Sequence, residues 1–574
     1  METSGNLAEG DPLKREEDGA EAGITPTGTK LRKKSFKETL GFANLTHWRT
    51  AIFFFSLFLC LTVVFAFSFV IPCPVRPQYL ASWERNFSDA ATYDFLAIED
   101  TSRDKVNDVL FVLKTQGNQN NTCSAAGLPS PCVFVFAVDG TDGTTVWERP
   151  LAPEYHWAQC GLEEGTSRSW DCLLSHSNQL TAIDKYTGDV RWQQPQPPGL
   201  HRTLPALSVP DLDKDKVSDL ALVASNNTQI QLIFISGKTG SQIGSTVVLD
   251  SIESTIHLLH RTPGGSHYVL LQNDTGLYGR ALWRIAAEAN PGMEADLKKD
   301  KHWENKASPT SGYVPIYESD SMRYVRSIGR TDKSPNLLVV TETEAASVDG
   351  KTSQLLWRFN TSAVLREPSF GHFNKDDVLD VVLEEDIGSY RKRVIILDGK
   401  SGGVLWEVEL MDAPNSPRPD AVHTINSFSI FVFWGSMPSK NSTVSTPALF
   451  KLPPNSFPTI GGSNENVSIQ VPMISDRCSY MLHPLYPNIL LESPSSLDHI
   501  VTFTATLMEH GRHAAFILLT GPETEGAEGT VVLGKRKLKQ DVPDSNVRPI
   551  GTSGTSETNE DIKAIFNRLR FSDW

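Results

Sequence analysis

Residues 397–406 read LDGKSGGVLW, and this short segment recurs along the chain. VDGTDGTTVW ends at Trp147, IDKYTGDVRW at Trp192 and VDGKTSQLLW at Trp357, each with an aspartate eight positions before the tryptophan. Four positions before the tryptophan stands a glycine or, in one copy, Ser353. An apolar strand, a turn that begins with aspartate and contains glycine, and a second strand with an aromatic residue are typical of a β-hairpin. The segment therefore predicts a repeated hairpin.

The spacing of the copies predicts the architecture. Their aspartates lie 45 residues apart at 139 and 184, and 49 apart at 349 and 398. ISGKTGSQIG at 235–244 is a fifth copy without the tryptophan, and TGLYGRALW at 275–283 is a degenerate sixth. A period near 50 residues is that of a four-stranded propeller blade. We therefore predict an all-β fold, a seven- or eight-bladed β-propeller whose first and last strands share one blade.

A second repeat places carboxylates before an apolar strand. EDTSRDKVNDVLFV begins at residue 99, PDLDKDKVSDLALV at 210 and GHFNKDDVLDVVLE at 371, with the shared pattern D-x-D-x-D-x-V-x-D. Only the second copy has all four carboxylates, which are Asp211, Asp213, Asp215 and Asp219. Oxygen ligands at positions 1, 3, 5 and 9 suit Ca²⁺ better than Zn²⁺, so these four are the predicted calcium ligands. The alternative is that they cap backbone amides without a metal. Lys216, where calcium loops usually have glycine, favours that alternative.

Residues 51–71 form a long apolar stretch, AIFFFSLFLCLTVVFAFSFVI, without a charged residue. A helix of this length spans the ~30 Å hydrocarbon core of a bilayer. Eight basic residues precede the stretch, and only Arg76 and Arg85 occur in the twenty residues after it. This asymmetry predicts a cytoplasmic N-terminus. We therefore expect a single transmembrane signal anchor in type II orientation.

The chain divides into five predicted segments. They are a disordered cytoplasmic tail (1–50), the transmembrane signal anchor (51–71), a juxtamembrane stalk (72–85), the β-propeller ectodomain (86–545) and a C-terminal segment (546–574). The last segment contains Ile562, Ile565, Phe566 and Leu569 at the i, i+3, i+4, i+7 spacing of an amphipathic helix. We expect this helix to pack on its own domain, with partner binding as the alternative.

Sequons and cysteines beyond the apolar stretch indicate the secretory pathway. Glycosylation sequons begin at Asn86, Asn120, Asn226, Asn273, Asn360, Asn441 and Asn466. Cys123 and Cys132 bracket one loop, and Cys160 and Cys172 bracket another. In an oxidising compartment each pair is predicted to form a disulfide, the alternative being four buried thiols. For Cys478, a bond to Cys73, a bond to a partner and a buried thiol all stay open.

The two repeats resemble known propeller units. GHFNKDDVLDVVLE and VPDLDKDKVSDLALV look like the FG-GAP repeats of the integrin α-subunit propeller, and the tryptophan hairpins look like repeats of quinoprotein-type propellers. Together with the anchor, residues 86–545 resemble the integrin-alpha FG-GAP-repeat-containing family of single-pass type II membrane proteins. The resemblance implies a propeller at the cell surface with no established catalytic activity. It associates calcium with Asp211, Asp213, Asp215 and Asp219 alone.

Charge and motifs narrow the function classes. The formal charge of −15 argues against a nucleic-acid partner. No HExxH, GxSxG, P-loop or GxGxxG motif is present, and we expect no enzyme and no cofactor other than calcium. The enzyme alternative is a quinone-dependent dehydrogenase, for which adjacent cysteines are expected; no two cysteines are neighbours here. Glu384 and Glu385 alternate across a strand and are expected to face solvent and the strand ladder.

The resulting hypothesis is a non-catalytic glycoprotein of the plasma membrane that passes through the secretory pathway. Its propeller is expected to bind or scaffold an extracellular protein partner, because propellers present loops on a rigid frame. The alternative is a lumenal adaptor or chaperone-like protein of the secretory pathway. The C-terminal residues 571–574 contain no KDEL-type signal, which favours transport onward to the surface.

Overall fold

A computed structural model describes residues 47–70, 79–117, 122–161, 172–197, 200, 206–226, 229–249, 257–273, 275–319, 321–329, 335–412, 416–437, 478–493, 499–509, 513–550 and 557–572. The chain forms two compact units, Met1–Arg76 and Pro77–Trp574. The described part of the first unit is one helix, α2 (His47–Val70). A search of the described residues finds no helix that is both long enough and apolar enough to cross a membrane.

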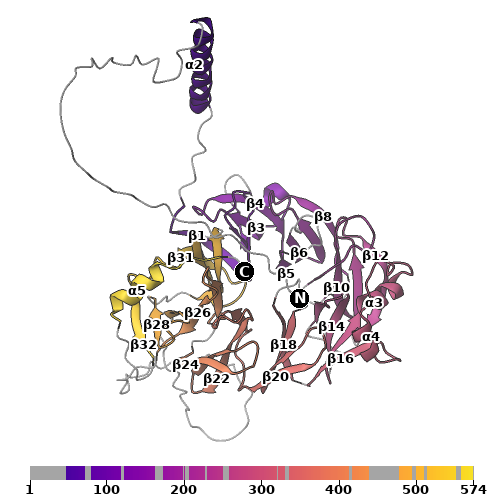
Figure 1. Ribbon diagram of the computed structural model, residues 1–574. Coiled ribbons are helices and arrows are strands. Elements are labelled where there is room, and N and C mark those ends of the chain that lie inside the picture. Colours follow the sequence, from indigo (N-terminus) through magenta and orange to yellow (C-terminus); the bar gives the residue numbers. More distant parts are fainter. Residues whose placement is uncertain are drawn as a thin grey trace, which may run out of the picture. The chain divides into compact units, whose positions relative to one another are not determined.

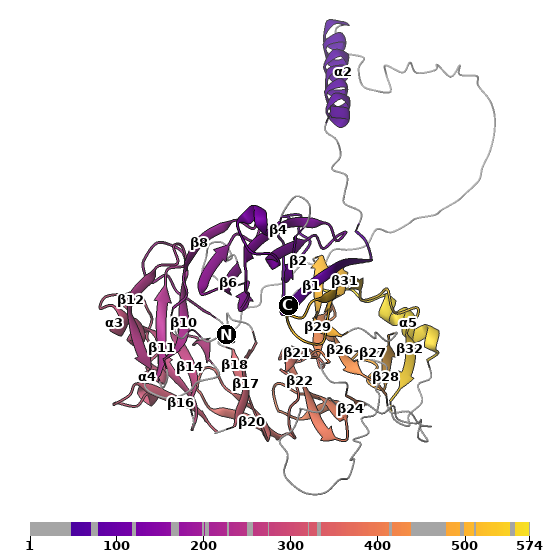
Figure 2. The same cartoon turned by 180° about the vertical axis from the view of Figure 1, so that it is seen from behind.

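The second unit is built from antiparallel strands. Its described residues form seven hydrogen-bonded sheets, six of them with four or five strands. In Figures 1 and 2 these sheets follow one another around a ring. This arrangement is the all-β propeller architecture that the repeat spacing predicts.

The sheets have these strands, each group in chain order. The first group is β1 (Ser82–Glu99), β2 (Asp108–Thr115), β3 (Cys132–Val138) and β4 (Thr145–Ala152); the second is β5 (Trp157–Gln159), β6 (Cys172–His176), β7 (Gln179–Ile183) and β8 (Val190–Pro195). The third is β9 (Leu207–Val209), β10 (Asp219–Asn226), β11 (Gln229–Ile235) and β12 (Gln242–Leu249); the fourth is β13 (His257–Arg261), β14 (His267–Asn273), β15 (Gly276–Ala281) and β16 (Tyr313–Glu318). The fifth is β17 (Met322–Ile328), β18 (Asn336–Thr341), β19 (Glu344–Val348) and β20 (Leu355–Asn360); the sixth is β21 (Ser369–Gly371), β22 (Asp380–Gly388), β23 (Arg391–Leu397) and β24 (Val404–Met411). The seventh is β25 (Asp420–His423), β26 (Ser429–Gly435), β27 (Cys478–Leu482) and β28 (Ile489–Glu492) with β32 (Asn546–Pro549); the last is β29 (Ile500–Glu509), β30 (His513–Thr520) and β31 (Gly529–Lys537).

Strand β1 joins the first group to the last. Its first half pairs with β31, from Ser82 opposite Arg536 onward, and its second half pairs with β2. Asp89, with a φ of 51°, lies at the register shift between the halves. The two groups therefore form one seven-stranded sheet, β29-β30-β31-β1-β2-β3-β4. A strand from the start of the chain thus completes the group at its end, as expected for a closed ring.

The core lies between neighbouring sheets. β2 and β3 have no exposed residue, because sheets cover both of their faces. One hydrophobic cluster joins Leu338 and Val340 of β18 to Val381 and Leu383 of β22 in the next sheet. Strands that are buried on both faces read as continuous apolar runs rather than alternating ones, which explains sequences such as CVFVFAV in β3.

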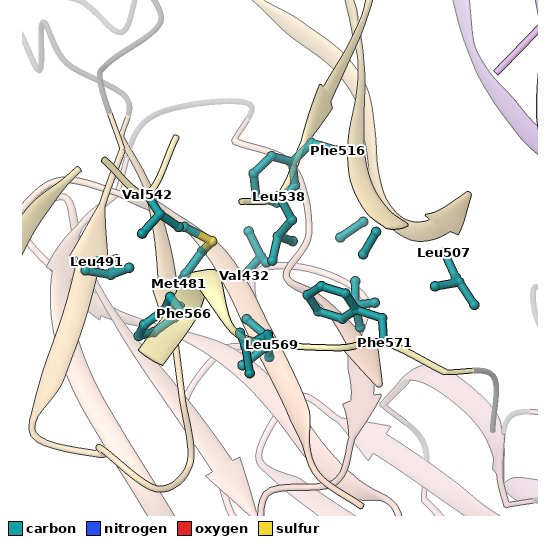
Figure 3. Packing of buried hydrophobic residues seen from close by; sticks show 14 of the residues in the cluster. Val432, Met481, Leu491, Leu507, Phe516, Leu538, Val542, Phe566, Leu569 and Phe571 are labelled. Carbon is teal, nitrogen blue, oxygen red and sulfur yellow. The ribbon is translucent and has the colours of Figure 1, made fainter. Parts of the chain in front are cut away.

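The C-terminal segment packs on the same unit, as expected. Helix α5 (Asn559–Asn567) begins with a capping box between Thr558 and Asp561. Ile562 and Phe566 of this helix, with Leu569 and Phe571 after it, belong to a cluster contributed by β26–β30. Figure 3 shows Phe566, Leu569 and Phe571 among side chains that include Val432, Met481 and Leu507.

The structure differs from the sequence-based expectation at both ends of the propeller. β1 begins at Ser82, within the range 72–85 assigned to the stalk, because SWERNF pairs with β31. The last strand, β32, does not share a sheet with β1; it pairs with β28 instead. The ring is therefore closed by β31 rather than by the last strand, and residues 546–549 add a fifth strand to the preceding sheet.

Candidate functional site

The second acidic loop, residues 211–219, joins β9 to β10. Asp211, Asp213 and Asp215 each place a carboxylate oxygen within 4.8 Å of the others. Asp213 is exposed and the other two are half-buried. Three carboxylates at this separation provide the hard oxygen ligands that Ca²⁺ takes in proteins. The structure thus brings together three of the four predicted ligands.

Asp219, the fourth predicted ligand, is oriented differently. Its Oδ2 accepts hydrogen bonds from the amides of Leu212 (2.6 Å) and Asp213 (3.3 Å), and its Oδ1 accepts one from the amide of Gly237 (3.1 Å). Burial of this fully enclosed carboxyl raises its pKa to about 7. Since both oxygens already accept amide protons, Asp219 orders the loop instead of facing a cation with the other three.

The aspartate at the ninth position has the same role in the other two acidic loops. Asp108 accepts from the amides of Thr101 and Ser102 through Oδ2 and from the amide of Gly140 through Oδ1. Asp380 accepts likewise from Phe373 and Asn374 and, through Oδ1, from Gly399. The glycine in each case lies in the tryptophan hairpin of the same sheet. The two repeats are therefore joined by a buried carboxylate, a connection that their separate patterns did not reveal.

In the third acidic loop the carboxylate cluster is not the predicted one. Asp376 and Asp380 of the loop lie with Asp398, their oxygens within 4.8 Å of one another. Asp398 comes from the turn between β23 and β24. His372 at the first position donates or accepts through Nδ1 at the carbonyl of Val378 (3.0 Å).

The tryptophans of the hairpins connect each sheet to the next. Trp357 on β20 donates from Nε1 to the carbonyl of Gly399 in the following sheet (2.8 Å). A Cβ added to Gly402, whose φ is 72°, would lie 2.6 Å from the Trp357 ring, so the ring lies directly on this left-handed glycine. Equivalent Nε1 bonds join Trp83 to Gly140, Trp147 to Lys185, Trp192 to Gly237 and Trp406 to Pro487.

Sequence reasoning missed two members of this network. Trp83 lies on the first half of β1, outside the hairpin pattern, and closes the contact between the last and first groups. Trp303 lies on the short helix α4 (Lys301–Lys306) and donates to the carbonyl of Lys351 (2.9 Å). Trp283 of the degenerate sixth copy is not on a hairpin strand; it lies on α3 (Leu282–Ala289) and donates to Glu304.

The expectation that Glu384 and Glu385 face solvent and the ladder is wrong. Both side chains are fully buried. Glu384 forms ion pairs with Lys392 (2.7 Å) and Arg366 (2.7 Å), and Glu385 with Arg393 (2.6 Å). Because a buried charge needs a hydrogen-bonded partner, these acids are part of the frame.

A cavity of about 950 Å³ lies inside the ring. Its walls come from five regions: β1 (Asp94–Glu99), β5, residues 365–367, residues 416–418 and β29 with the connection after β30. Five carboxylates and two guanidinium groups line it, those of Asp94, Glu99, Glu367, Glu523, Glu525, Arg366 and Arg418. Volumes of this size are typical of small-molecule sites.

Several charges in the wall are paired within the protein. Glu99 forms an ion pair with Lys185 (2.8 Å), and Glu367 with Arg418 (3.0 Å). Arg366 is held by Glu384 and by Asp412 (3.0 Å). In the described part of the chain, no ion pair involves Asp94, Glu523 or Glu525. The cavity therefore has an excess of negative charge.

Both predicted disulfides are present. Cys123 is bonded to Cys132, and Cys160 to Cys172, with Cα atoms 5.8 and 4.2 Å apart respectively. Cys160 also lines the cavity. Cys478 is half-buried at the start of β27, and Cys73 lies outside the described residues.

The sequons have different structural settings. Asn86 on β1 and Asn360 at the end of β20 are exposed. Asn226 and Asn273 are the last residues of β10 and β14. Asn120, Asn441 and Asn466 lie outside the described residues.

Comparison with known proteins identifies relatives of the whole chain. The family model described as "FAM234A/B beta-propeller" matches residues 83–454 and 457–572. Protein FAM234A of Bos taurus is 34% identical over 563 residues, covering 96% of this chain and 95% of that protein. Protein FAM234B of Homo sapiens is 25% identical over 549 residues, covering 92% and 83% respectively.

Solved structures are more distant. Quinohemoprotein alcohol dehydrogenase from Comamonas testosteroni has 10% sequence identity and a TM-score of 0.39, over 84% of this chain and 79% of that chain. A likeness at this level carries no inference about activity. The family model and the FAM234A relatives cover nearly the full length instead, and the chain belongs to the FAM234A/B beta-propeller family.

Proposed function

We propose that the chain is a glycosylated type II membrane protein of the plasma membrane whose propeller is a non-catalytic binding module for an extracellular partner. The observation that supports a binding role is the cavity of about 950 Å³ within the ring. Tryptophan bonds between sheets and aspartate bonds within them make a rigid frame around it, on which loops are held in fixed positions.

The membrane and glycan parts of the proposal rest on the sequence. The uncharged stretch 51–71 supports a single anchor, and the basic residues before it support a cytoplasmic N-terminus. The exposed positions of Asn86 and Asn360 support glycan attachment. The two disulfides support an oxidising compartment.

Two finer features belong to the same proposal. We assign eight blades to the ring, because the two halves of β1 each complete a four-stranded group. We assign a calcium site to Asp211, Asp213 and Asp215, whose carboxylates would hold the ion and fix the loop between β9 and β10. The likeness of these loops to FG-GAP repeats supports the assignment.

Surface biotinylation of cells that express the full-length protein, combined with proximity labelling from its C-terminus, tests the proposed function. We expect a surface pool, glycosidase-sensitive mobility and labelling of extracellular proteins. Recovery of endoplasmic reticulum partners alone, with no surface pool, would favour the lumenal adaptor. A quinone chromophore in the absorbance spectrum of the purified protein would contradict the non-catalytic part.

A further inference from the structure

The cavity has one corner where unpaired carboxylates and aromatic rings meet. Asp94 of β1 and Glu525 of the connection between β30 and β31 both line the cavity. Tyr93 and Tyr155 lie beside them, with ring centroids 4.7 Å apart. Burial raises the pKa of Tyr155, and the charges of Asp94 and Glu525 raise it further, which places both carboxylates near this ring.

Two carboxylates beside two aromatic rings form a typical environment for an organic cation. The carboxylates supply charge-assisted hydrogen bonds, and tyrosine faces attract ammonium groups within about 6 Å. Asp94 is hydrogen-bonded to the hydroxyl of Thr502, and burial raises its pKa. An ammonium ion beside Asp94 would offset the cost of keeping this carboxylate ionised.

The rest of the wall selects the same charge. Arg366 is saturated, because its guanidinium donates to Glu384, to Asp412 and to the carbonyl of Ser416 (2.6 Å). Arg418 is paired with Glu367. The two arginines therefore offer little attraction for an anionic ligand, whereas Glu523 and Glu525 add exposed negative charge to the wall.

We propose that this cavity binds a ligand with a primary ammonium group, which is recognised between Asp94, Glu525 and the Tyr93–Tyr155 pair. The inference deepens the proposed binding function and rests on it. A flexible polyamine and a lysine side chain of a peptide present the same group, and the cavity volume accommodates either.

Calorimetric titration of the purified full-length protein with spermidine, and separately with a short lysine-containing peptide and its acetylated form, tests this proposal. We expect binding of spermidine or of the lysine peptide, and no binding of the acetylated peptide. The double variant Asp94→Asn, Glu525→Gln should weaken the Kd at least about tenfold, which corresponds to about 1.4 kcal/mol. The control Glu557→Gln, which removes one exposed charge outside the cavity, should leave the Kd within about twofold.

The outcomes separate the possible ligands and the two proposals. Binding of spermidine alone supports a polyamine, and binding of the lysine peptide alone supports a peptide partner. Absence of binding by both, or equal weakening in the Glu557→Gln control, overturns the ammonium site. If the double variant melts with the wild type and still labels the same extracellular proteins, the binding function stands without the ammonium site.

Discussion

Carboxylates occur in two settings within this propeller, at the hairpin turns and in the central cavity. At the turns, Asp108, Asp219 and Asp380 are buried and accept hydrogen bonds from three backbone amides each. In the cavity, Asp94 and Glu525 have no ion pair among the described residues. The comparison separates acids that hold the ring together from acids that are available to a ligand, since buried polar groups are normally satisfied by the protein itself.

The largest effect is expected when a tryptophan at a turn is removed. Trp357→Ala deletes the ring that lies on Gly402 and the hydrogen bond to Gly399. We expect the free energy of unfolding to fall by about 4 kcal/mol, as for other buried tryptophans, in a denaturant titration followed by circular dichroism. The control Trp48→Ala, at an exposed position in the first unit, should leave the transition unchanged.

A smaller loss is expected when the buried aspartate of the second acidic loop is changed. Asp219→Asn replaces one acceptor oxygen by an NH₂ group, which would then face a backbone amide of Leu212, Asp213 or Gly237. Leaving such a buried donor unsatisfied costs about 2–3 kcal/mol in the free energy of unfolding. A transition identical to that of the wild type would mean that the turn does not depend on this carboxylate.

The sequence predicted the propeller because both repeats are local. The hairpin pattern sets strand, turn and strand within ten residues, and its spacing gives the period of one sheet. The disulfides were predictable for the same reason, since each closes a short loop. The amphipathic spacing of Ile562 and Phe566 was sufficient to predict α5 and its packing.

What the sequence could not give depends on contacts between distant segments. Asp219 has the spacing of a metal ligand, yet its orientation is set by the amide of Gly237 in the next hairpin. Trp303 replaces a hairpin tryptophan from a helix, so no repeat pattern marks it. The cavity residues come from β1, β5 and β29, which only ring closure brings together.

The calcium assignment is tested by one pair of matched substitutions. Asp215 and Asp104 occupy the fifth position of the second and first acidic loops, and each accepts from the amide two residues later. We expect Asp215→Ala to abolish the heat of calcium binding in calorimetry and Asp104→Ala to preserve it, because only the second loop has all three front carboxylates. Calcium heat that survives in the Asp215→Ala variant would contradict the assignment.

A buried histidine extends the comparison to a group that gains charge on unfolding. Burial among aromatic rings lowers the pKa of His483 to about 4, below its ordinary 6.5. Unfolding then takes up a proton, so this contribution to stability is complete above pH 6.5 and is lost as pH falls towards 4. The melting temperature of His483→Gln should decline less between pH 6.5 and pH 4.5 than that of the wild type. The exposed control His302→Gln should follow the wild type.

The most direct test measures stability and ligand binding in the same two variants, Asp219→Asn and Asp94→Asn. The account predicts that Asp219→Asn loses about 2–3 kcal/mol of unfolding free energy and keeps spermidine affinity. It predicts that Asp94→Asn stays within about 0.5 kcal/mol of the wild type and loses affinity. Equal stability losses in both variants, or loss of affinity only in Asp219→Asn, would contradict the division between carboxylates that hold the ring and carboxylates that bind.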